Sequence, residues 1–431
     1  MSEFFDKMID SLMDLLAIDS TQGMPHPLSP FGKGVGECLQ YIDELSKKMG
    51  FVTHNEEGYY LTADVGEGDS FGILGHVDVV PWDDDWDYSP LGERVGDLIF
   101  GRGVLDDKGP MLCCLWATYE LLQRGLKPRK KIRFVWGGNE ESGWKCIERY
   151  MQKDVMPSQG FSPDGDFPVI NCEKGLAHWQ VKIPAPDGMT SIKGGSRGNI
   201  VMADCECTLH GKVDVKPSEK VKVTTVDGNT VLYATGKPAH ASTPWQGDNA
   251  LWHVLDALKL VNSQWAKLDS LLSNNDGSGV GAKLSDDKSG KLTFNVGCVD
   301  SEKTDGKTWI TLTIDTRIPV TYPIHYVGEL ISKALGATAE LVHFHNPLYV
   351  EQNSELVQSL LAVYNEQTGQ NAKPIAIGGG TYARALPCGV AFGPIFPDQI
   401  STIHQKNECV DIPTLRKTYE IYKQAIFKLC F

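Results

Sequence analysis

The chain has 431 residues, of which 41% are hydrophobic and 22% are charged, a balance typical of globular proteins that excludes disordered, collagen-like and coiled-coil chains. At about 150 residues per domain, this length predicts two or three domains. The formal net charge of −14 disfavours binding to nucleic-acid phosphates or to anionic membrane surfaces. We therefore expect neither nucleic acid nor membrane among its partners.

The cysteines and the N-terminal residues bear on location. The eleven cysteines are odd in number and form no C-x-x-C pair, which indicates reduced thiols rather than a disulfide framework or a structural zinc site. Residues 1–10 lack the basic segment of a secretory signal, and no stretch approaches the about 18 apolar residues of a membrane span. These features predict a cytoplasmic protein.

The first part of the chain alternates helical and strand patterns. Apolar residues recur at helical spacing over 4–17 and 35–49. Further along, strands are predicted at 71–80, 131–138 and 167–175, and helices at 111–125 and 141–152. This alternation predicts an α/β domain whose mixed sheet has helices on both faces.

The pattern changes at about His178. Short β-type runs follow, separated by helical stretches at 249–272 and 325–335, which predicts an α+β domain. Long amphipathic helices return at 355–369 and 413–429. The predicted organisation is a discontinuous α/β domain, residues 1–177 and 347–431, with an α+β domain, residues 178–346, inserted in its middle.

A histidine and an aspartate end the strand predicted at 71–80. His76 and Asp78 lie two residues apart, so their side chains leave the same face. A carboxylate beside an imidazole can accept its second N–H and leave the other nitrogen for a metal. The alternative is a core histidine that is hydrogen-bonded to a neighbour.

Two pairs of adjacent carboxylates lie at predicted helix starts. Asp106-Asp107, among glycines, could cap a helix or supply a carboxylate that bridges two cations. Glu140-Glu141 lies where a strand ends and a helix begins, the place where open α/β sheets bind ligands. Adjacent glutamates repel unless a cation or a shared proton relieves them, so one could bind a metal while the other acts as a general base. A solvated helix start is the alternative.

Two weaker signals complete the set. Asp164 stands in Ser-Pro-Asp-Gly, which by itself indicates a turn, and His404 stands in a polar loop far downstream. Together with the earlier motifs they place two histidines and at least three carboxylates in one α/β domain.

The ordered motifs G-H-x-D-x-V-P, G-R-G-x-x-D-D-K-G-P, E-E-S-G-W, S-P-D and T-I-H-Q-x-N-E resemble the co-catalytic metallopeptidase family of dipeptidase PepV, aminoacylase and carboxypeptidase G. The resemblance spans essentially the whole chain. With G-G-G-T-Y-A-R added, the set is most similar to the PepV-type branch of Xaa-His or carnosinase-like dipeptidases. The resemblance implies a catalytic domain of zinc-exopeptidase type and an enlarged, ferredoxin-like lid domain.

The resemblance also implies a two-metal site. His76 and Asp164 would hold one cation, Glu141 and His404 the other, and Asp106 would bridge both. Imidazole and carboxylate ligands favour zinc, with manganese and cobalt as alternatives.

The same resemblance assigns two supporting roles in the catalytic domain. Asp78 would orient His76. Glu140 would be the general base, which takes a proton from a water activated by the two metals and passes it to the leaving amine.

Further implied roles concern substrate binding. His240 would reach over the site to stabilise the tetrahedral oxyanion, with Asn199 in the same neighbourhood, and Arg317 could bind a substrate carboxylate in fork geometry. In the glycine loop, Gly379 and Arg384 would face the substrate's C-terminal carboxylate, because glycine permits close approach of the backbone. Read without the resemblance, His240 and Asn199 indicate turns and Arg317 a surface ion pair. The glycine loop could be a phosphate-cradling loop, but it lacks the Lys-Ser/Thr ending of one.

The expected function is hydrolysis of short unblocked peptides by a metal-dependent dipeptidase. A deacylase of N-acyl amino acids is one alternative, and a catalytically silent binding protein with the same fold is another. The inserted region of about 170 residues exceeds the size of one four-stranded βαββαβ unit, and in PepV-like enzymes an enlarged lid supplies what a partner subunit supplies in dimeric relatives. A monomer is therefore favoured over a dimer.

Overall fold

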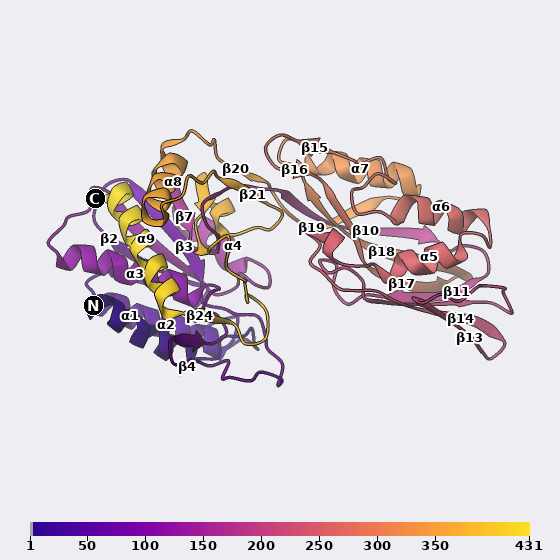
Figure 1. The fold of residues 1–431 in the computed structure, drawn as a ribbon, viewed down its shortest axis with the longest axis horizontal. Helices are drawn as coiled ribbons and strands as arrows, with labels where there is room; N and C mark the ends of the chain where they lie inside the picture. Colours follow the sequence, from indigo (N-terminus) through magenta and orange to yellow (C-terminus); the bar gives the residue numbers. More distant parts are fainter. Residues whose placement is uncertain (1–2) are drawn as a thin grey trace. The chain divides into compact units, whose positions relative to one another are not determined.

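The computed structural model describes residues 3–431, which form two units (Figure 1). Unit 1 contains the residues up to Asn171, together with Val350–Ile375 and Thr381–Phe431. Unit 2 contains Cys172–Tyr349 and Ala376–Gly380. The expected fold class, an α/β unit interrupted by an α+β unit, is confirmed.

Unit 1 is built on a mixed sheet. From its outer edge the strands run in the order β1-β2-β6-β3-β7-β22-β9. The central strands β6, β3, β7 and β22 are parallel to one another, whereas β1, β2 and β9 pair antiparallel. The helices are α1 (Glu3–Leu16), α2 (Lys33–Lys48), α3 (Lys108–Gln123), α4 (Lys145–Lys153), α8 (Glu355–Thr368) and α9 (Ile412–Cys430), with a short 3-10 turn η2 (Tyr382–Ala385).

The strands associated with unit 1 are β1 (Val52–Glu56), β2 (Tyr60–Val65), β3 (Ser70–His76), β4 (Glu93–Val95), β5 (Leu98–Phe100), β6 (Lys131–Gly137), β7 (Gln159–Ser162), β8 (Gly165–Asp166), β9 (Ile170–Glu173), β21 (Ile375–Ile377), β22 (Cys388–Ala391), β23 (Pro394–Ile395) and β24 (Cys409–Asp411). Strand β3 is buried along nearly its whole length, so both faces of the sheet are covered, as parallel strands require. Helix α3 packs against α1 and α9.

Unit 2 contains an antiparallel sheet in the order β13-β14-β12-β11-β17-β18-β10-β19. Its elements are β10 (Gly175–Pro184), β11 (Met189–Gly194), β12 (Asp204–Leu209), β13 (Val221–Val226), β14 (Asn229–Thr235), η1 (Pro244–Gln246), α5 (Ala250–Leu258), α6 (Ser263–Leu272), β15 (Ser285–Asp286), β16 (Gly290–Lys291), β17 (Thr293–Thr304), β18 (Lys307–Ile318), α7 (Ile324–Leu335), β19 (Ala339–His345) and β20 (Leu348–Tyr349).

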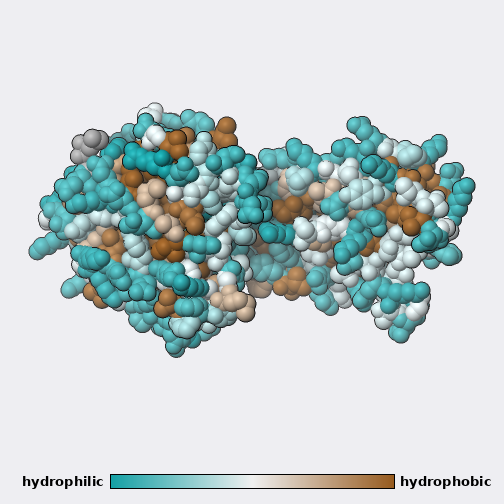
Figure 2. All heavy atoms as spheres, turned by 90° about the horizontal axis from the view of Figure 1, so that it is seen from below, coloured by the Kyte–Doolittle hydropathy of each residue, from teal (hydrophilic) through white to brown (hydrophobic). Residues whose placement is uncertain are grey.

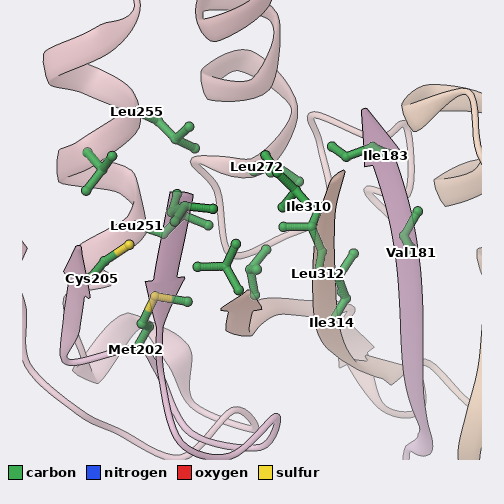
Figure 3. Packing of buried hydrophobic residues seen from close by; sticks show 14 of the residues in the cluster. Val181, Ile183, Met202, Cys205, Leu251, Leu255, Leu272, Ile310, Leu312 and Ile314 are labelled. Carbon is green, nitrogen blue, oxygen red and sulfur yellow. The ribbon is translucent and has the colours of Figure 1, made fainter. Parts of the chain in front are cut away.

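The core of unit 2 lies on one face of this sheet. Along β10 burial alternates, so Val181 and Ile183 point to the helices while their neighbours face outward. In Figure 3 these side chains meet Ile310 and Leu312 of β18, and Leu251 projects from α5 toward the same layer. The period of two in the sequence therefore determines which face is buried.

Three predicted elements differ from the structure. The helix predicted at 141–152 begins only at Lys145, because residues 140–143 form a turn. The stretch predicted as one helix at 249–272 is two helices, and Asn262 starts the second by accepting the main-chain N–H groups of Gln264 and Trp265. The strand predicted at 71–80 ends at His76, so Asp78 lies in the following loop.

The hydropathy of the surface is that of an ordinary globular protein. Figure 2 shows hydrophilic side chains over most of the face drawn, with apolar residues exposed in patches. Within residues 3–431, no helix is both long and apolar enough to cross a membrane.

Candidate active site

The ends of three neighbouring parallel strands of unit 1 carry the predicted site residues. His76 is the last residue of β3, Glu140 follows β6, and Asp164 follows β7. These strands are adjacent in the order β6-β3-β7 and run parallel. Because the carboxyl ends of parallel strands meet at one edge of the sheet, residues separated by dozens of positions come together there.

A second, small sheet brings Asp106 and His404 to the same edge. Strand β5 pairs antiparallel with β24, with Phe100 opposite Cys409. The loop that follows β5 therefore runs beside the loop that precedes β24. The first loop carries Asp106 and the second carries His404.

Asp106 lies at the centre of the resulting cluster. Its Oδ1 is 2.9 Å from Nε2 of His76, and its Oδ2 is 2.9 Å from Nε2 of His404. His404 Nε2 is also 2.9 Å from Oε1 of Glu141, and Asp164 Oδ2 is 3.8 Å from His76 Nε2. The structure thus brings together all five residues that the sequence analysis assigned to metal binding.

Asp78 contacts both His76 and the turn that carries Glu140 and Glu141. Nδ1 of His76 is 2.8 Å from the main-chain carbonyl oxygen of Asp78 and 3.5 Å from its carboxylate. Since a carbonyl only accepts, Nδ1 carries the proton and Nε2 faces Asp106. The Asp78 carboxylate instead accepts the main-chain N–H groups of Glu140 (2.9 Å) and Glu141 (3.1 Å). One residue therefore orients both the histidine and the glutamate pair.

Glu140 has a partner to which the sequence analysis assigned no role. The indole Nε1 of Trp144 donates to Oε1 of Glu140 at 3.2 Å. Trp144 has a left-handed backbone (φ 65°), which is uncommon for a residue with a Cβ. The only sequence signal was the position of Trp144 within E-E-S-G-W, because its contact with Glu140 depends on this local conformation.

The electrostatics of the cluster are dominated by crowded carboxylates. Burial raises the pKa of Glu140, and the nearby charges of Glu141 and Asp106 raise it further. Burial likewise raises the pKa of Asp164 well above its usual range, with Asp106 adding to the effect. These groups repel one another in a poorly solvated place.

The pKa of His404 is also raised, but by neighbouring charges and not by burial. Partial burial by itself would lower the pKa of His404, but contacts with Asp106 and Glu141 raise it to about 11. Burial also raises the pKa of Asp106, yet hydrogen bonds from His404 and His76 more than offset this and hold it well below its usual range. Asp106 is therefore the carboxylate of the cluster that is most strongly held in its charged form.

The donor set fits divalent cations. One ligand atom each from His76, Asp106 and Glu141 lies within 4.8 Å of the others, and imidazole nitrogen with carboxylate oxygen suits ions such as zinc. Carboxylates outnumber imidazoles here, so bound cations would relieve their repulsion. The competing interpretation of Asp106-Asp107 as a helix cap does not hold, because Asp107 precedes α3 without making a side-chain capping bond.

In unit 2, His240 and Asn199 are neighbours. Ile200 and His240 form an isolated β-bridge, and the main-chain N–H of Ala241 donates to the carbonyl oxygen of Asn199 at 2.9 Å. The main-chain N–H of Ser242 donates to Nδ1 of His240. A neutral His240 ring therefore carries its proton on Nε2, which makes that nitrogen a donor.

Arg317 has two partners within unit 2, Asp315 and Gly378. Its Nε and Nη2 bind the two carboxylate oxygens of Asp315 at 2.8 and 2.9 Å, and its Nη1 donates to the carbonyl oxygen of Gly378 at 2.8 Å. Arg317 and Asp315 are two apart on β18 and share a face, so the fork is already bound within the strand. Gly379 lies next to this contact in unit 2, and Arg384 lies in η2 of unit 1.

The chain is similar to known proteins over most of its length. The family described as peptidase family M20/M25/M40 matches residues 72–428. The Bacillus subtilis (strain 168) protein named "Putative dipeptidase YtjP" is 35% identical over 450 residues, which cover 98% of this chain and 95% of that protein.

Two solved structures share the fold. The M20 family metallo-carboxypeptidase Sso-CP2 from Sulfolobus solfataricus aligns with a TM-score of 0.60 at 18% identity, over 99% of each chain. The Bacillus subtilis YXEP protein, described as a dinuclear metal binding peptidase, aligns with a TM-score of 0.54 at 12% identity, over 100% of each chain.

Proposed function

This chain belongs to peptidase family M20/M25/M40, and from this premise we propose that it is a metal-dependent dipeptidase, a hydrolase that cleaves short unblocked peptides. The dipeptidase name of the Bacillus subtilis relative, which aligns over nearly the whole of both chains, supports the substrate class. One observation in the structure carries the proposal. The two oxygens of Asp106 each face a different imidazole, those of His76 and His404.

The proposed centre contains two divalent cations. His76 and Asp164 would hold one, Glu141 and His404 would hold the other, and Asp106 would be a ligand of both. Mixed nitrogen and oxygen ligands favour zinc, with manganese and cobalt as alternatives. When bound, such a pair of cations polarises a carbonyl and lowers the pKa of water.

Glu140 is the proposed general base. It takes a proton from the attacking water and later delivers it to the leaving amine, which requires a carboxylate close to the ligands but not one of them. The hydrogen bond from Trp144 orients one carboxylate oxygen of Glu140. Asp78 fixes the main chain of Glu140 and Glu141, so the base and the adjacent ligand are held by one turn.

We propose roles in substrate binding for residues outside the metal cluster. His240 donates Nε2–H to the substrate oxygen as it gains negative charge, and Asn199 lies beside it. Gly379 offers its main-chain N–H, and Arg384 its guanidinium, to the C-terminal carboxylate of the peptide. Arg317 positions the glycine loop through its bond to the Gly378 carbonyl.

A cytoplasmic location is part of the proposal. Its support is chemical: all eleven cysteines are free thiols, and most of them are buried. Reduced thiols are the rule in the cytoplasm, where disulfides are rare.

The direct test is a metal-supplemented assay of one panel of dipeptides beside one panel of N-acyl amino acids. We expect hydrolysis of dipeptides and none of the acylated compounds, with Glu140→Gln as the inactive control. Cleavage of the acylated panel alone would make the protein a deacylase. A protein that binds cations but cleaves neither panel would be a binding protein.

A further inference from the structure

A buried ion pair joins the two loops that carry Asp106 and His404. Nη1 of Arg102 donates to Oε2 of Glu408 at 2.8 Å, and the two side chains are only 4% and 0% exposed. Arg102 lies in the loop after β5, four residues before Asp106. Glu408 lies four residues after His404 and directly precedes β24.

Glu408 also holds the main chain of the Asp106 loop. Its other carboxylate oxygen, Oε1, accepts the N–H groups of Gly103 at 3.2 Å and Leu105 at 2.9 Å. Its own carbonyl oxygen accepts the N–H of Gly101 at 3.0 Å. One residue therefore binds the loop at three backbone positions, of which Leu105 is adjacent to Asp106.

Arg102 extends the connection to a third segment. Its guanidinium lies 5.1 Å from the centre of the Trp86 ring, and its main-chain N–H donates to the carbonyl of Pro90. From the opposite side, the amide of Asn407 binds both the main chain and the carboxylate of Asp87. Three loops are thus joined around the Arg102–Glu408 pair.

The chemistry of the pair points to a geometric role. Removing two charges from water costs about as much as their attraction returns, so a buried ion pair is weak evidence for stability alone. An ion pair that also accepts backbone N–H groups specifies one arrangement of the segments that it joins. His76 and Asp164 depend on other supports, since His76 ends β3 and Asp164 follows β7.

We propose that Arg102 and Glu408 are positioning residues that lock the Asp106 loop to the His404 loop and thereby assemble the half of the metal centre formed by His404 and Glu141. This inference rests on the proposed two-cation function. It assigns the pair a selective effect. When the pair is lost, Asp106 keeps its contact with His76, but the His404 loop loses its tie to the Asp106 loop, so the cation on the His404 side binds more weakly and the cation on the His76 side stays in place.

The test is a titration of metal-stripped protein with Co²⁺, followed by calorimetry and by visible absorption of the bound ion. Glu408→Gln removes the charge of the pair at nearly constant shape. The matched control is Glu120→Gln, because Glu120 is also a fully buried glutamate of unit 1 and binds Lys423 and Tyr419 between α3 and α9. We expect Glu408→Gln to bind the second equivalent at least about tenfold more weakly, the scale of effect that follows when a group that helps to orient a metal ligand is lost, and the first equivalent as in the wild type.

Two further readouts separate positioning from general damage. Excess Co²⁺ restores kcat of Glu408→Gln with little change in KM, whereas it does not restore Glu140→Gln. Both Co²⁺ affinities of Glu120→Gln equal those of the wild type. If Glu408→Gln does not fold, Arg102→Lys, which keeps the charge but loses the guanidinium geometry, is titrated under the same criteria.

The inference is overturned if the second affinity is unchanged in the Glu408 or Arg102 variant, if both affinities fall equally, or if Glu120→Gln shows the same selective loss. With wild-type protein that binds two equivalents and cleaves dipeptides, any of these results leaves the proposed function intact. A wild type that binds fewer than two equivalents overturns the inference and the two-cation centre together.

Discussion

At the scale of single residues, the site depends on which atom of each side chain faces its neighbour. Asp106 presents one oxygen to His76 and the other to His404, an arrangement suited to a bridging ligand. Glu140 is adjacent to the proposed ligand Glu141 but is bound to Trp144. This difference in partner is the physical basis for giving two consecutive glutamates different roles.

The first prediction concerns Glu140. Glu140→Gln should lower kcat by about 10²–10⁴, the contribution of a general base, while two cations remain bound, because Glu140 is not a proposed ligand. Activity and metal content are measured on the same preparation. The neighbouring Glu141→Gln is the contrasting variant and should lose metal. Near wild-type turnover in Glu140→Gln would remove Glu140 from the mechanism.

The second prediction concerns the bridge. Asp106→Ala should lose both cations together, since within residues 3–431 no other carboxylate contacts both imidazoles and the positive charges would then repel without screening. His76→Ala and His404→Ala should each weaken mainly one cation. Metal analysis of the three purified variants decides the matter, and two cations retained in Asp106→Ala would refute the bridge.

The third prediction concerns His240. His240→Ala should lower kcat by about 10²–10³, the typical effect of removing one oxyanion donor, with unchanged metal content. His253→Ala is a matched control, because His253 is also a partly exposed histidine of unit 2 and binds Asp248. Unchanged kcat in His240→Ala would identify it as an ordinary turn histidine.

At the scale of elements, a charged cluster ties two strands of unit 2. Asp315 on β18 accepts hydrogen bonds from Arg317 on its own strand and is 2.8 Å from Nε2 of His178 on the adjacent β10. Burial by itself would raise the pKa of Asp315, but Arg317 and His178 lower it to about 2. The cluster therefore stabilises the pairing of β10 with β18 through a charged carboxylate.

The pH dependence follows from this direction. A carboxyl whose pKa is lower in the folded state stabilises that state above its unfolded pKa of about 3.9 and loses this contribution as the pH falls toward about 2. The loss should amount to about 2 kcal/mol in the free energy of unfolding. Urea denaturation between pH 2 and 5 would measure it, as the difference between wild type and Asp315→Asn. Asp287→Asn, which changes an exposed aspartate, is the control and should keep the pH dependence of the wild type. An equal pH slope in all three proteins would contradict the assignment.

At the scale of the whole molecule, one chain builds the eight-stranded sheet of unit 2. The resemblance to PepV-like enzymes implies that an enlarged inserted domain supplies, within one chain, what a partner subunit supplies in dimeric relatives. We therefore predict a monomer. Light scattering of the purified protein across a range of concentrations should give a mass near 47.4 kDa. A stable dimer at all concentrations would overturn this prediction.

The sequence by itself determined the features that depend on local patterns. The helical spacing of apolar residues over 4–17 and 35–49 predicted the helices α1 and α2, and the apolar run before His76 predicted a buried strand that ends in polar groups. The chain order of the motifs was enough to identify the family and to propose all five metal-binding residues. These inferences succeed because helix and strand periods, and the residue types that bind cations, are properties of short segments.

Only the tertiary structure decided which partners these residues have. Asp78 uses its carbonyl for His76 and its carboxylate for the glutamate turn, Arg317 binds Asp315 within its own strand, and Glu408 pairs with Arg102 across 306 positions. No local period encodes such contacts. They depend on strand order, on the β5–β24 pairing and on left-handed backbone positions such as Trp144 and His404, all of which are set when distant segments pack together.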